Sequence, residues 1–168
     1  VPAGPEVPLP KKELAGHIPQ FVDGIRAFAA EKGIRYDVLH SHYWMSGLAA
    51  EALSDAWGGT PILHMFHTLG EMKNRVARSE MEREGAYRLD GERRVLRRAD
   101  RVVAATIAEQ AQLEWLYKAD TSRITVIPPG VDTCHFYPIP TDEARQFVGI
   151  PCGDRVVLFV GRIEPLKG

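Results

Sequence analysis

The sequence predicts an α/β fold in which a doubly wound parallel sheet carries helices on both faces. Short apolar segments alternate with segments of helical periodicity along the chain, as in successive βαβ units. The apolar segments are also nearly continuous rather than alternating, which is typical of strands buried on both faces of a parallel sheet. We expect five such strands, at residues 36–40, 60–68, 101–106, 123–127 and 154–161.

Two helices are predicted before the second strand. From residue 14 to residue 32, apolar side chains recur at helical spacing, and Gly33 follows where a left-handed C-cap belongs. Residues 46–58 form the second helix, and Ser46 is its expected N-cap.

Three more helical segments are predicted further along the chain. Residues 71–98 are rich in charge and poor in apolar side chains, which predicts a partly exposed helix with basic and acidic faces. Thr106 and Glu109 have the spacing of a capping box that opens a helix over residues 107–117. A short helix is expected near residues 142–149.

The composition is that of an ordinary globular domain with one core: 168 residues, 45% hydrophobic, 26% charged and a net charge of -1. The 21 Lys and Arg residues are balanced by 22 Asp and Glu residues, so no nucleic-acid partner is indicated and phosphate binding must come from local groups. Cys134 and Cys152 lack CxxC spacing, which favours a reducing cytoplasm over a disulfide framework. No membrane span or secretion signal is visible.

The two ends of the sequence indicate a fragment of a longer protein. The chain begins at Val1 without Met and stops at Gly168, just after an apolar run where a helix is expected. Residues 1–135 are predicted to be part of an N-terminal domain and residues 136–153 a linker. Residues 154–168 are then the start of a second α/β domain.

In open parallel sheets, ligands bind beyond the carboxyl ends of the strands, so the residues after each strand are the first candidates for a site. In this chain those positions carry imidazole, hydroxyl, aromatic and cationic side chains. They are His40, Ser41, His42, Tyr43 and Trp44 after the first strand, His67, Thr68 and Lys73 after the second, and Gly161, Arg162 and Lys167 after the last.

The segment "GRIEPLKG" places Arg162 and Lys167 in a loop that should lead into a helix N-terminus. Two cations beside free backbone N–H groups suit a diphosphate. An exposed loop with two solvated charges is the open alternative. The sequence has neither a Walker A motif nor GxGxxG, which excludes the usual nucleotide-binding fingerprints.

The histidines allow two other interpretations. A zinc site built from His40, His42, His64 and His67 is geometrically conceivable, but no carboxylate follows at ligand spacing and there is no HExxH motif. A hydrolase triad lacks both a GxSxG elbow and an acid to orient the base. No metal or other cofactor is therefore expected. Because there is no Asp-x-Asp pair either, a diphosphate leaving group would be stabilised by fixed cations.

Four segments, in order, resemble the retaining nucleotide-sugar glycosyltransferases of the GT-B fold: "DVLHSHYWMSG", "HTLGEMKN", "VIPPGVD" and "FVGRIEPLKG". The resemblance is greatest to the branch of glycosyltransferase family four that contains sucrose-phosphate synthases and the inositol-phosphate N-acetylglucosaminyltransferase of mycothiol synthesis. It implies two facing Rossmann-like domains, of which the N-terminal one binds the acceptor and the C-terminal one holds most of the nucleotide-sugar.

The resemblance also implies roles for individual residues. The implied catalytic and donor-diphosphate residues are His67, Gly161, Arg162 and Lys167. The implied acceptor-site residues are Tyr43, Thr68, Lys73 and Arg88. Physical chemistry agrees with the second set, because two cations and two hydroxyls can bind an acceptor phosphate through charge-assisted contacts. A solvated surface side chain is the alternative for Arg88.

The expected function is transfer of a sugar from a nucleoside-diphosphate sugar to a hydroxyl of a small, phosphorylated acceptor, with retention and without a metal. The main alternative is a non-catalytic sugar- or nucleotide-binding module or a degenerate homologue, and a zinc-dependent hydrolase is a third. The family's glycine-rich loop would lie before Val1 and its E-x7-E element beyond Gly168. The chain alone is therefore expected to be inactive.

Overall fold

The computed structural model describes residues 1–163. Contacts divide the chain into two compact units, the first spanning Val1–Pro128 and the second starting at Pro129. The first unit contains all four strands of the sheet and every described helix except the one at Thr141–Val148.

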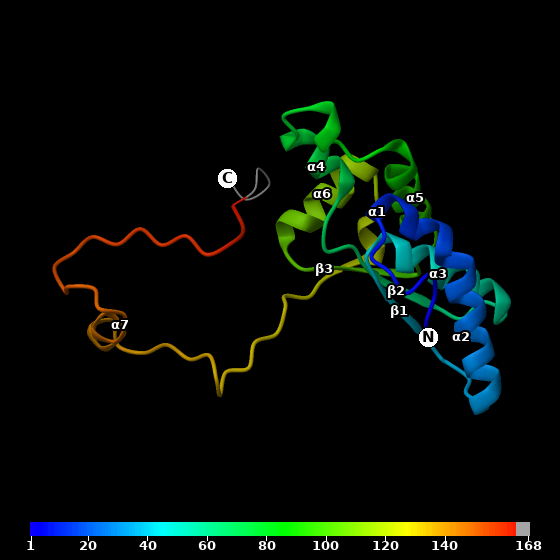
Figure 1. Ribbon diagram of the computed structural model, residues 1–168, viewed down its shortest axis with the longest axis horizontal. Coiled ribbons are helices and arrows are strands. Elements are labelled where there is room, and N and C mark those ends of the chain that lie inside the picture. Colours follow the sequence, from blue (N-terminus) through cyan, green and yellow to red (C-terminus); the bar gives the residue numbers. More distant parts are fainter. Residues whose placement is uncertain (164–168) are drawn as a thin grey trace. The chain divides into compact units, whose positions relative to one another are not determined.

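The first unit is built on a four-stranded parallel sheet, which confirms the predicted α/β class (Figure 1). The strands follow one another across the sheet in chain order. They are β1 (Leu39–His42), β2 (Ile62–Met65), β3 (Arg101–Ala104) and β4 (Ile124–Val126). β2, β3 and β4 lie within their predicted strands and are shorter than the apolar runs that predicted them. β1 shares only residues 39 and 40 with the strand predicted at residues 36–40, and it continues to His42, which was expected to lie beyond the strand end.

Helices and short 3-10 turns connect the strands. Before β1 come α1 (Lys11–Leu14), η1 (Ala15–His17) and α2 (Ile18–Lys32). Between the strands lie α3 (Trp44–Ala56), α4 (Gly70–Val76), η2 (Glu80–Glu82), α5 (Ala86–Arg98), α6 (Ile107–Tyr117) and η3 (Thr121–Arg123). The second unit contains α7 (Thr141–Val148), which confirms the short helix predicted there.

Two predicted helix ends are confirmed by their capping geometry. Gly33 closes α2 with a left-handed φ of 62°. At the start of α6, the Thr106 hydroxyl accepts a hydrogen bond from the Glu109 backbone N–H at 3.0 Å. The Glu109 carboxylate accepts in turn from the Ala105 N–H at 2.7 Å, one residue earlier than in the usual capping box.

The prediction that Ser46 is an N-cap is wrong, because α3 begins two residues earlier, at Trp44. Tyr43 is the capping residue, with a left-handed φ of 70° and no side-chain cap. Ser46 lies in the first helical turn, where its hydroxyl donates back to the Tyr43 carbonyl at 3.0 Å and also to the His42 carbonyl. A serine inside a helix satisfies its hydroxyl in this way, so its presence alone does not fix the helix start.

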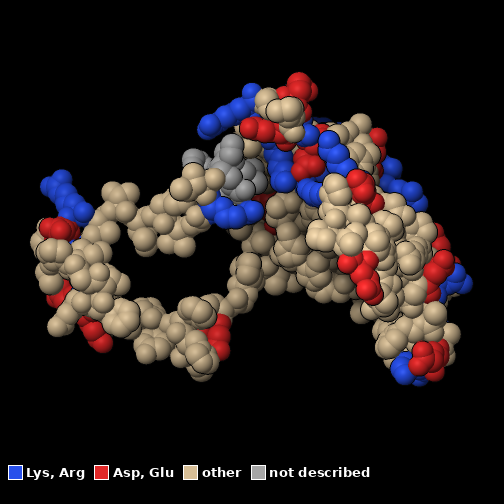
Figure 2. All heavy atoms as spheres, viewed as in Figure 1, with Lys and Arg blue, Asp and Glu red and all other residues tan. Residues whose placement is uncertain are grey.

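The charged segment 71–98 forms three elements rather than the single helix that its composition predicts, although the last of them, α5, is partly exposed as expected. It forms α4, η2 and α5, and α5 buries two charged side chains, Arg88 and Glu92, which are both 0% exposed. Figure 2 shows cationic and acidic side chains side by side where these three elements reach the surface. Because opposite charges pair inside the fold, a charge-rich helix can pack into the core without a broad apolar face.

The prediction of a fifth strand at residues 154–161 is also wrong. These residues have no strand assignment, and Val157 is 99% exposed. A strand requires a hydrogen-bonded neighbour, and within residues 1–163 no strand pairs with this segment. The apolar run therefore predicts strand propensity but does not provide a partner.

The core lies between the sheet and its helices, and a second apolar cluster joins α2 to α3. The main cluster includes Phe66, Val95, Val102 and Leu113, whose side chains are at most 2% exposed. Val22, Ala49 and Leu53 form the second cluster. Figure 1 shows α2 and α3 lying beside each other, as the many contacts between them require.

Replacing Gly91 with Ala is expected to lower the free energy of unfolding by about 1–3 kcal/mol. A methyl group on Gly91 of α5 would lie 2.6 Å from Cε3 of Trp44, a side chain that is 1% exposed and has little room to move. Gly16→Ala is the matched control, since nothing lies within 4 Å of its Cβ position. Urea unfolding measures both, and equal stability of the two variants would contradict this packing.

Candidate functional site

The carboxyl ends of β1 and β2 bring together histidines that are far apart in the sequence. His42, the last residue of β1, and His67, which follows β2, share a hydrogen bond of 2.7 Å between Nδ1 and Nε2. Their rings stack with centroids 5.0 Å apart, and the His40 ring packs at a tilt against His42, with centroids 4.3 Å apart. Burial, followed by the neighbouring imidazoles His40 and His67, lowers the pKa of His42.

Two residues at this sheet edge have a strained backbone. Tyr43 and His67 have φ values of 70° and 61°, in the left-handed region that side chains with a Cβ rarely adopt. Tyr43 follows directly on β1 and His67 lies two residues beyond the end of β2. Tyr43 still donates its N–H to the Met65 carbonyl at 2.8 Å. Strain of this kind costs about 1–3 kcal/mol per residue and is concentrated at functional sites in proteins.

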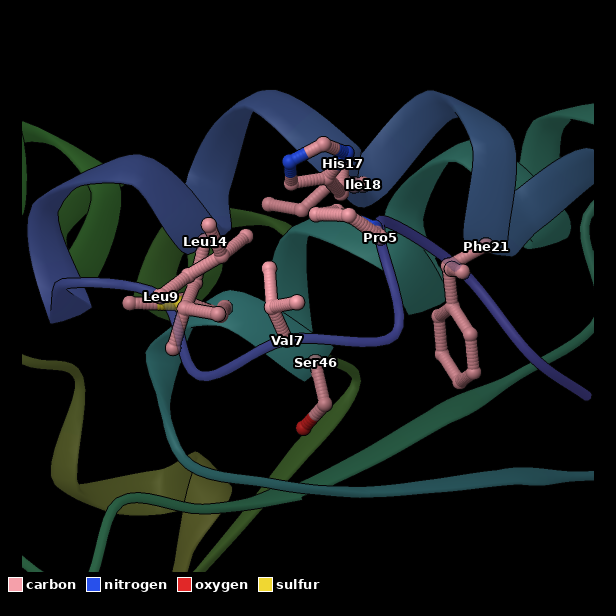
Figure 3. A pocket seen from close by; sticks show the side chains of 10 residues that line it. Pro5, Val7, Leu9, Leu14, His17, Ile18, Phe21 and Ser46 are labelled. Atoms are coloured by element: carbon pink, nitrogen blue, oxygen red, sulfur yellow. The ribbon is translucent and has the colours of Figure 1, made fainter.

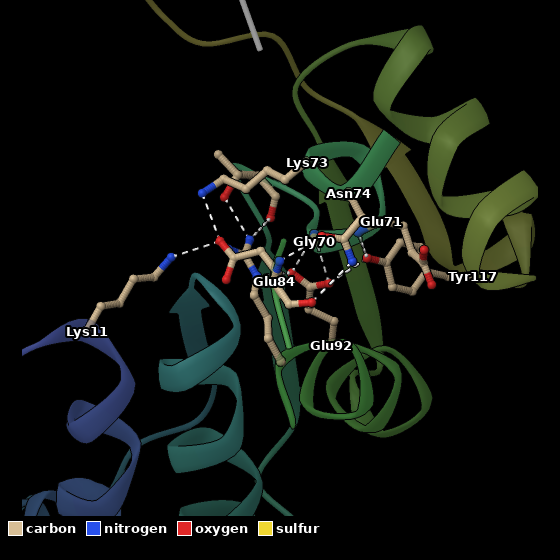
Figure 4. Close-up of polar contacts among 10 residues, drawn as sticks. Lys11, Gly70, Glu71, Lys73, Asn74, Glu84, Glu92 and Tyr117 are labelled. Atoms are coloured by element: carbon tan, nitrogen blue, oxygen red, sulfur yellow. Dashed lines mark hydrogen bonds and ion pairs between the residues drawn. The ribbon is translucent and has the colours of Figure 1, made fainter. Parts of the chain in front are cut away.

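The four predicted acceptor-site residues meet in one cluster, on the side of α5 that faces the end of β2. Arg88 donates from Nη2 to the Thr68 hydroxyl at 3.1 Å, and its Cζ lies 5.3 Å from the centroid of the Tyr43 ring. Lys73 of α4 and Arg88 both contact the carboxylate of Glu84, at 2.9 and 2.5 Å. Figure 4 shows Lys73 reaching Glu84.

Lys11 joins this cluster, although the sequence analysis did not single it out. Its Nζ lies 3.2 Å from the Glu84 carboxylate (Figure 4). The same atom lies 5.5 Å from the centroid of the Tyr43 ring. Burial alone lowers the pKa of Lys11, but the Tyr43 hydroxyl and the Glu84 carboxylate outweigh it, so the pKa is raised. The only signal in the sequence is a pair of lysines at the end of a proline-rich segment, which does not indicate a spatial neighbour.

Glu92 anchors the cluster from inside the fold. Both of its carboxylate oxygens accept from the Gly70 N–H at 3.0 Å, and they also accept from Arg88 Nε at 2.9 Å and from the Tyr117 hydroxyl at 2.5 Å. Burial and the adjacent carboxylate of Glu92 raise the pKa of Tyr117, which keeps the hydroxyl protonated as a donor. Because Gly70 is the first residue of α4, Glu92 fixes both Arg88 and the helix that carries Lys73.

His64 is a buried core residue, unlike the exposed His40, His42 and His67. It is 0% exposed, and its Nδ1 shares a 2.8 Å hydrogen bond with the buried Ser41 hydroxyl. Burial, and then the charges on His42 and His67, lower the pKa of His64 to about 3. Ser41 is only 4% exposed, so this Ser–His pair cannot present a nucleophile to a substrate.

The stability of the chain is expected to fall as the pH is lowered from about 6.5 to 5. In this window unfolded His64 takes up a proton near its usual pKa of 6.5, whereas folded His64 stays neutral down to about 3. The unfolded state therefore binds more protons, and each pH unit below 6.5 costs up to about 1.4 kcal/mol. Urea unfolding at pH 7.5, 6 and 5 measures the slope. His64→Gln should flatten it, and an unchanged slope in that variant would refute the assignment.

The structure does not test the predicted donor-diphosphate residues. Gly161 and Arg162 belong to the second unit, and Lys167 lies outside the described residues. Their predicted role is therefore carried only by the sequence.

The apolar pocket in Figure 3 lies apart from the predicted site residues. It has a volume of about 330 Å³ and is formed by the N-terminal segment against α2 and the start of α3. Its lining includes Val7, Leu14, Ile18 and Phe21 but none of the predicted catalytic or acceptor residues. Among residues 1–163, no group of three or more His, Cys, Asp or Glu side chains is placed to hold a metal ion. In the same range, no helix has the length and apolar character to cross a membrane.

Comparison with known proteins identifies relatives for the whole chain. Glycosyltransferase Family 4 matches residues 1–135. The D-inositol 3-phosphate glycosyltransferase of Acidothermus cellulolyticus is 45% identical over 169 residues, which cover 100% of this chain and 38% of the relative. The corresponding protein of Thermobispora bispora is 43% identical and is covered over 39% of its length.

A solved structure agrees with these relatives. The sucrose-phosphate synthase of Thermosynechococcus elongatus superposes with a TM-score of 0.78 at 32% identity, over 96% of this chain and 39% of that one. The chain thus spans under two fifths of the length of each of these three proteins. From the match over residues 1–135 and the identity across the full chain, the chain belongs to glycosyltransferase family 4.

Proposed function

We propose that the protein containing this chain transfers a glycosyl group from a nucleoside-diphosphate sugar to a hydroxyl of a phosphorylated acceptor, with retention of configuration and without a metal. Family membership supports glycosyl transfer. The names of the relatives, D-inositol 3-phosphate glycosyltransferase and sucrose-phosphate synthase, both include a phosphorylated polyol or sugar.

The observation that carries the acceptor proposal is the convergence of cations and hydroxyls beyond the ends of β1 and β2. Lys11, Lys73 and Arg88 meet at one carboxylate oxygen, with Tyr43 and Thr68 beside Arg88. Cations held together against their mutual repulsion favour an anion, and a phosphate oxygen accepts such charge-assisted hydrogen bonds well. The phosphate would fix the acceptor, and His67 lies at the same edge of the sheet, two residues beyond β2.

We assign His67 to the donor sugar near the reacting carbon. The His67 imidazole is exposed, and the hydrogen bond that it shares with His42 orients it. It can therefore contact a bound sugar without any rearrangement of the core. Gly161, Arg162 and Lys167 are proposed to bind the donor diphosphate. Two fixed cations there would stabilise the negative charge that develops on the leaving group, which is the role a divalent metal plays in other transferases.

The chemistry then depends on positioning and charge stabilisation. The acceptor phosphate is bound at a point remote from the reacting hydroxyl. Fixing the phosphate orients that hydroxyl toward the anomeric carbon of the donor, so the binding energy offsets the entropic cost of bringing the two substrates together. The two free cysteines, Cys134 and Cys152, are exposed and fit a reducing compartment, so we propose a cytoplasmic enzyme.

Product analysis with the full-length protein tests the proposal. Nucleoside-diphosphate sugars are supplied with inositol phosphate or fructose 6-phosphate, and the anomeric configuration of the product is read by proton NMR. We expect the configuration of the donor to be retained and the rate to survive treatment with EDTA. An inverted product would refute retention, and activity restored only by added Mg²⁺ would refute metal independence. Sugar binding without any transfer would favour the non-catalytic module.

A further inference from the structure

The three cations of the acceptor cluster, Lys11, Lys73 and Arg88, all contact the same carboxylate oxygen. Glu84 Oε1 lies 2.5 Å from Arg88 Nη1, 2.9 Å from Lys73 Nζ and 3.2 Å from Lys11 Nζ. These cations come from α5, α4 and α1, so three separate elements direct positive charge at the same point. Figure 4 shows Lys11 and Lys73 approaching Glu84 from different elements. The Glu84 side chain is 14% exposed, at the boundary between the buried pair and the solvent.

The charges of the cluster do not cancel. Lys11, Lys73 and Arg88 contribute three positive charges against two negative charges from Glu84 and Glu92. Glu92 is committed to the core by its bonds to Gly70 and Tyr117 and is 0% exposed. If the Glu84 carboxylate left, two positive charges would stay in excess at the mouth of the cluster, which matches a phosphate dianion.

The backbone of Glu84 is held independently of its side chain. Its N–H donates to Asn74 Oδ1 at 2.7 Å, and its carbonyl accepts from Asn74 Nδ2 at 3.2 Å. Asn74 belongs to α4, the helix that also carries Lys73. Rotation of the Glu84 side chain toward solvent therefore does not require the loop before α5 to detach from α4.

We propose that Glu84 is an internal substitute for the acceptor phosphate: its carboxylate occupies the phosphate site while no acceptor is bound and is displaced when a phosphorylated acceptor binds. This inference rests on the proposed function. It makes Glu84 a specificity-determining residue, because a neutral acceptor cannot compete with a carboxylate for three cations. A phosphate dianion can, since it brings more charge and more acceptor oxygens.

The pKa of Glu84 agrees with this occupancy. Burial by itself raises that pKa, but the hydrogen bond from Lys73 and the charges of Arg88 and Lys11 outweigh burial and lower it. The carboxylate is therefore ionised at neutral pH and competes as an anion.

Inhibition by inorganic phosphate tests the proposal in the full-length protein. Glu84→Gln removes the competing charge, so we expect its inhibition constant for phosphate and its KM for inositol phosphate to fall about tenfold relative to the wild type. Glu80→Gln is the matched control, since the Glu80 side chain is 87% exposed, pairs with the nearby Arg83 and lies outside the cluster. Weaker or unchanged phosphate binding in Glu84→Gln would overturn the proposal, because a carboxylate that merely arranges the cations would have that effect.

A measurement on the wild-type protein avoids any effect of the substitution on folding. With carbon-13 label on the glutamate carboxylates, Glu84 should titrate at a higher pH in saturating phosphate than without it, because phosphate takes its cations. An unchanged titration would overturn the substitution model. A different result would show that the proposed acceptor site itself is wrong. In that case inorganic phosphate would not inhibit the wild-type enzyme, or it would inhibit the Lys11→Ala variant as strongly as the wild type.

Discussion

Replacing Arg88 with Met is expected to lower the free energy of unfolding by about 3–5 kcal/mol. The Arg88 side chain is 0% exposed and lies between Glu84 and Glu92. Met retains much of the volume but leaves the fully buried Glu92 carboxylate without its cation. An uncompensated buried charge is far more costly than the loss of a solvated ion pair.

The control for this variant lies on the same helix. Arg94 of α5 contacts Glu51 at 2.6 Å, but its own side chain is 62% exposed, so Arg94→Met should cost at most about 1 kcal/mol. Urea unfolding of the two variants at neutral pH gives the comparison. If Arg88→Met is no less stable than Arg94→Met, the buried pair does not support the fold as described.

Replacing Lys11 and Lys73 together with Ala is expected to lower kcat/KM for a phosphorylated acceptor by about 100-fold or more. Each hydrogen bond to a charged group contributes roughly 1.5–3 kcal/mol, and both of these would be made to the acceptor phosphate. The Lys11 and Lys73 side chains are 44% and 32% exposed, so their removal should leave the fold intact. Most of the loss should appear in KM.

Lys12→Ala is the matched control for the double variant. Lys12 is adjacent to Lys11 in α1 and is also exposed, but it is not among the cations that meet at Glu84. Steady-state kinetics with phosphorylated and unphosphorylated acceptors separates the cases. Equal losses for both acceptors would show that the two lysines do not recognise phosphate.

Much of the fold follows from local patterns in the sequence. Apolar runs predicted the four strands of the sheet, and Gly33 and Thr106 marked helix ends that depend on neighbouring residues alone. The start of α3 was missed because it depends on the left-handed backbone of Tyr43, for which a tyrosine gives no signal. The strand predicted at residues 154–161 is not formed, because a strand needs a hydrogen-bonded partner and an apolar run does not show whether one is present.

The candidate site was predicted in part, for a similar reason. The rule that ligands bind at the carboxyl ends of parallel strands, together with the family resemblance, selected residues that the structure does bring together, including Tyr43, Thr68 and Arg88. The burial of Arg88 and the position of Lys11 could not be predicted. Both depend on ion pairs between residues up to 73 positions apart, and a charged residue looks the same in a sequence whether it is paired or solvated.

The most direct test of the proposed acceptor chemistry is the ratio of kcat/KM values for inositol phosphate and for inositol, measured with the full-length protein and one nucleoside-diphosphate sugar. If the cluster of Lys11, Lys73 and Arg88 binds the acceptor phosphate, the ratio should be about 100 or more, and it should fall toward one in the Lys11 and Lys73 double variant. A wild-type ratio near one would contradict the account.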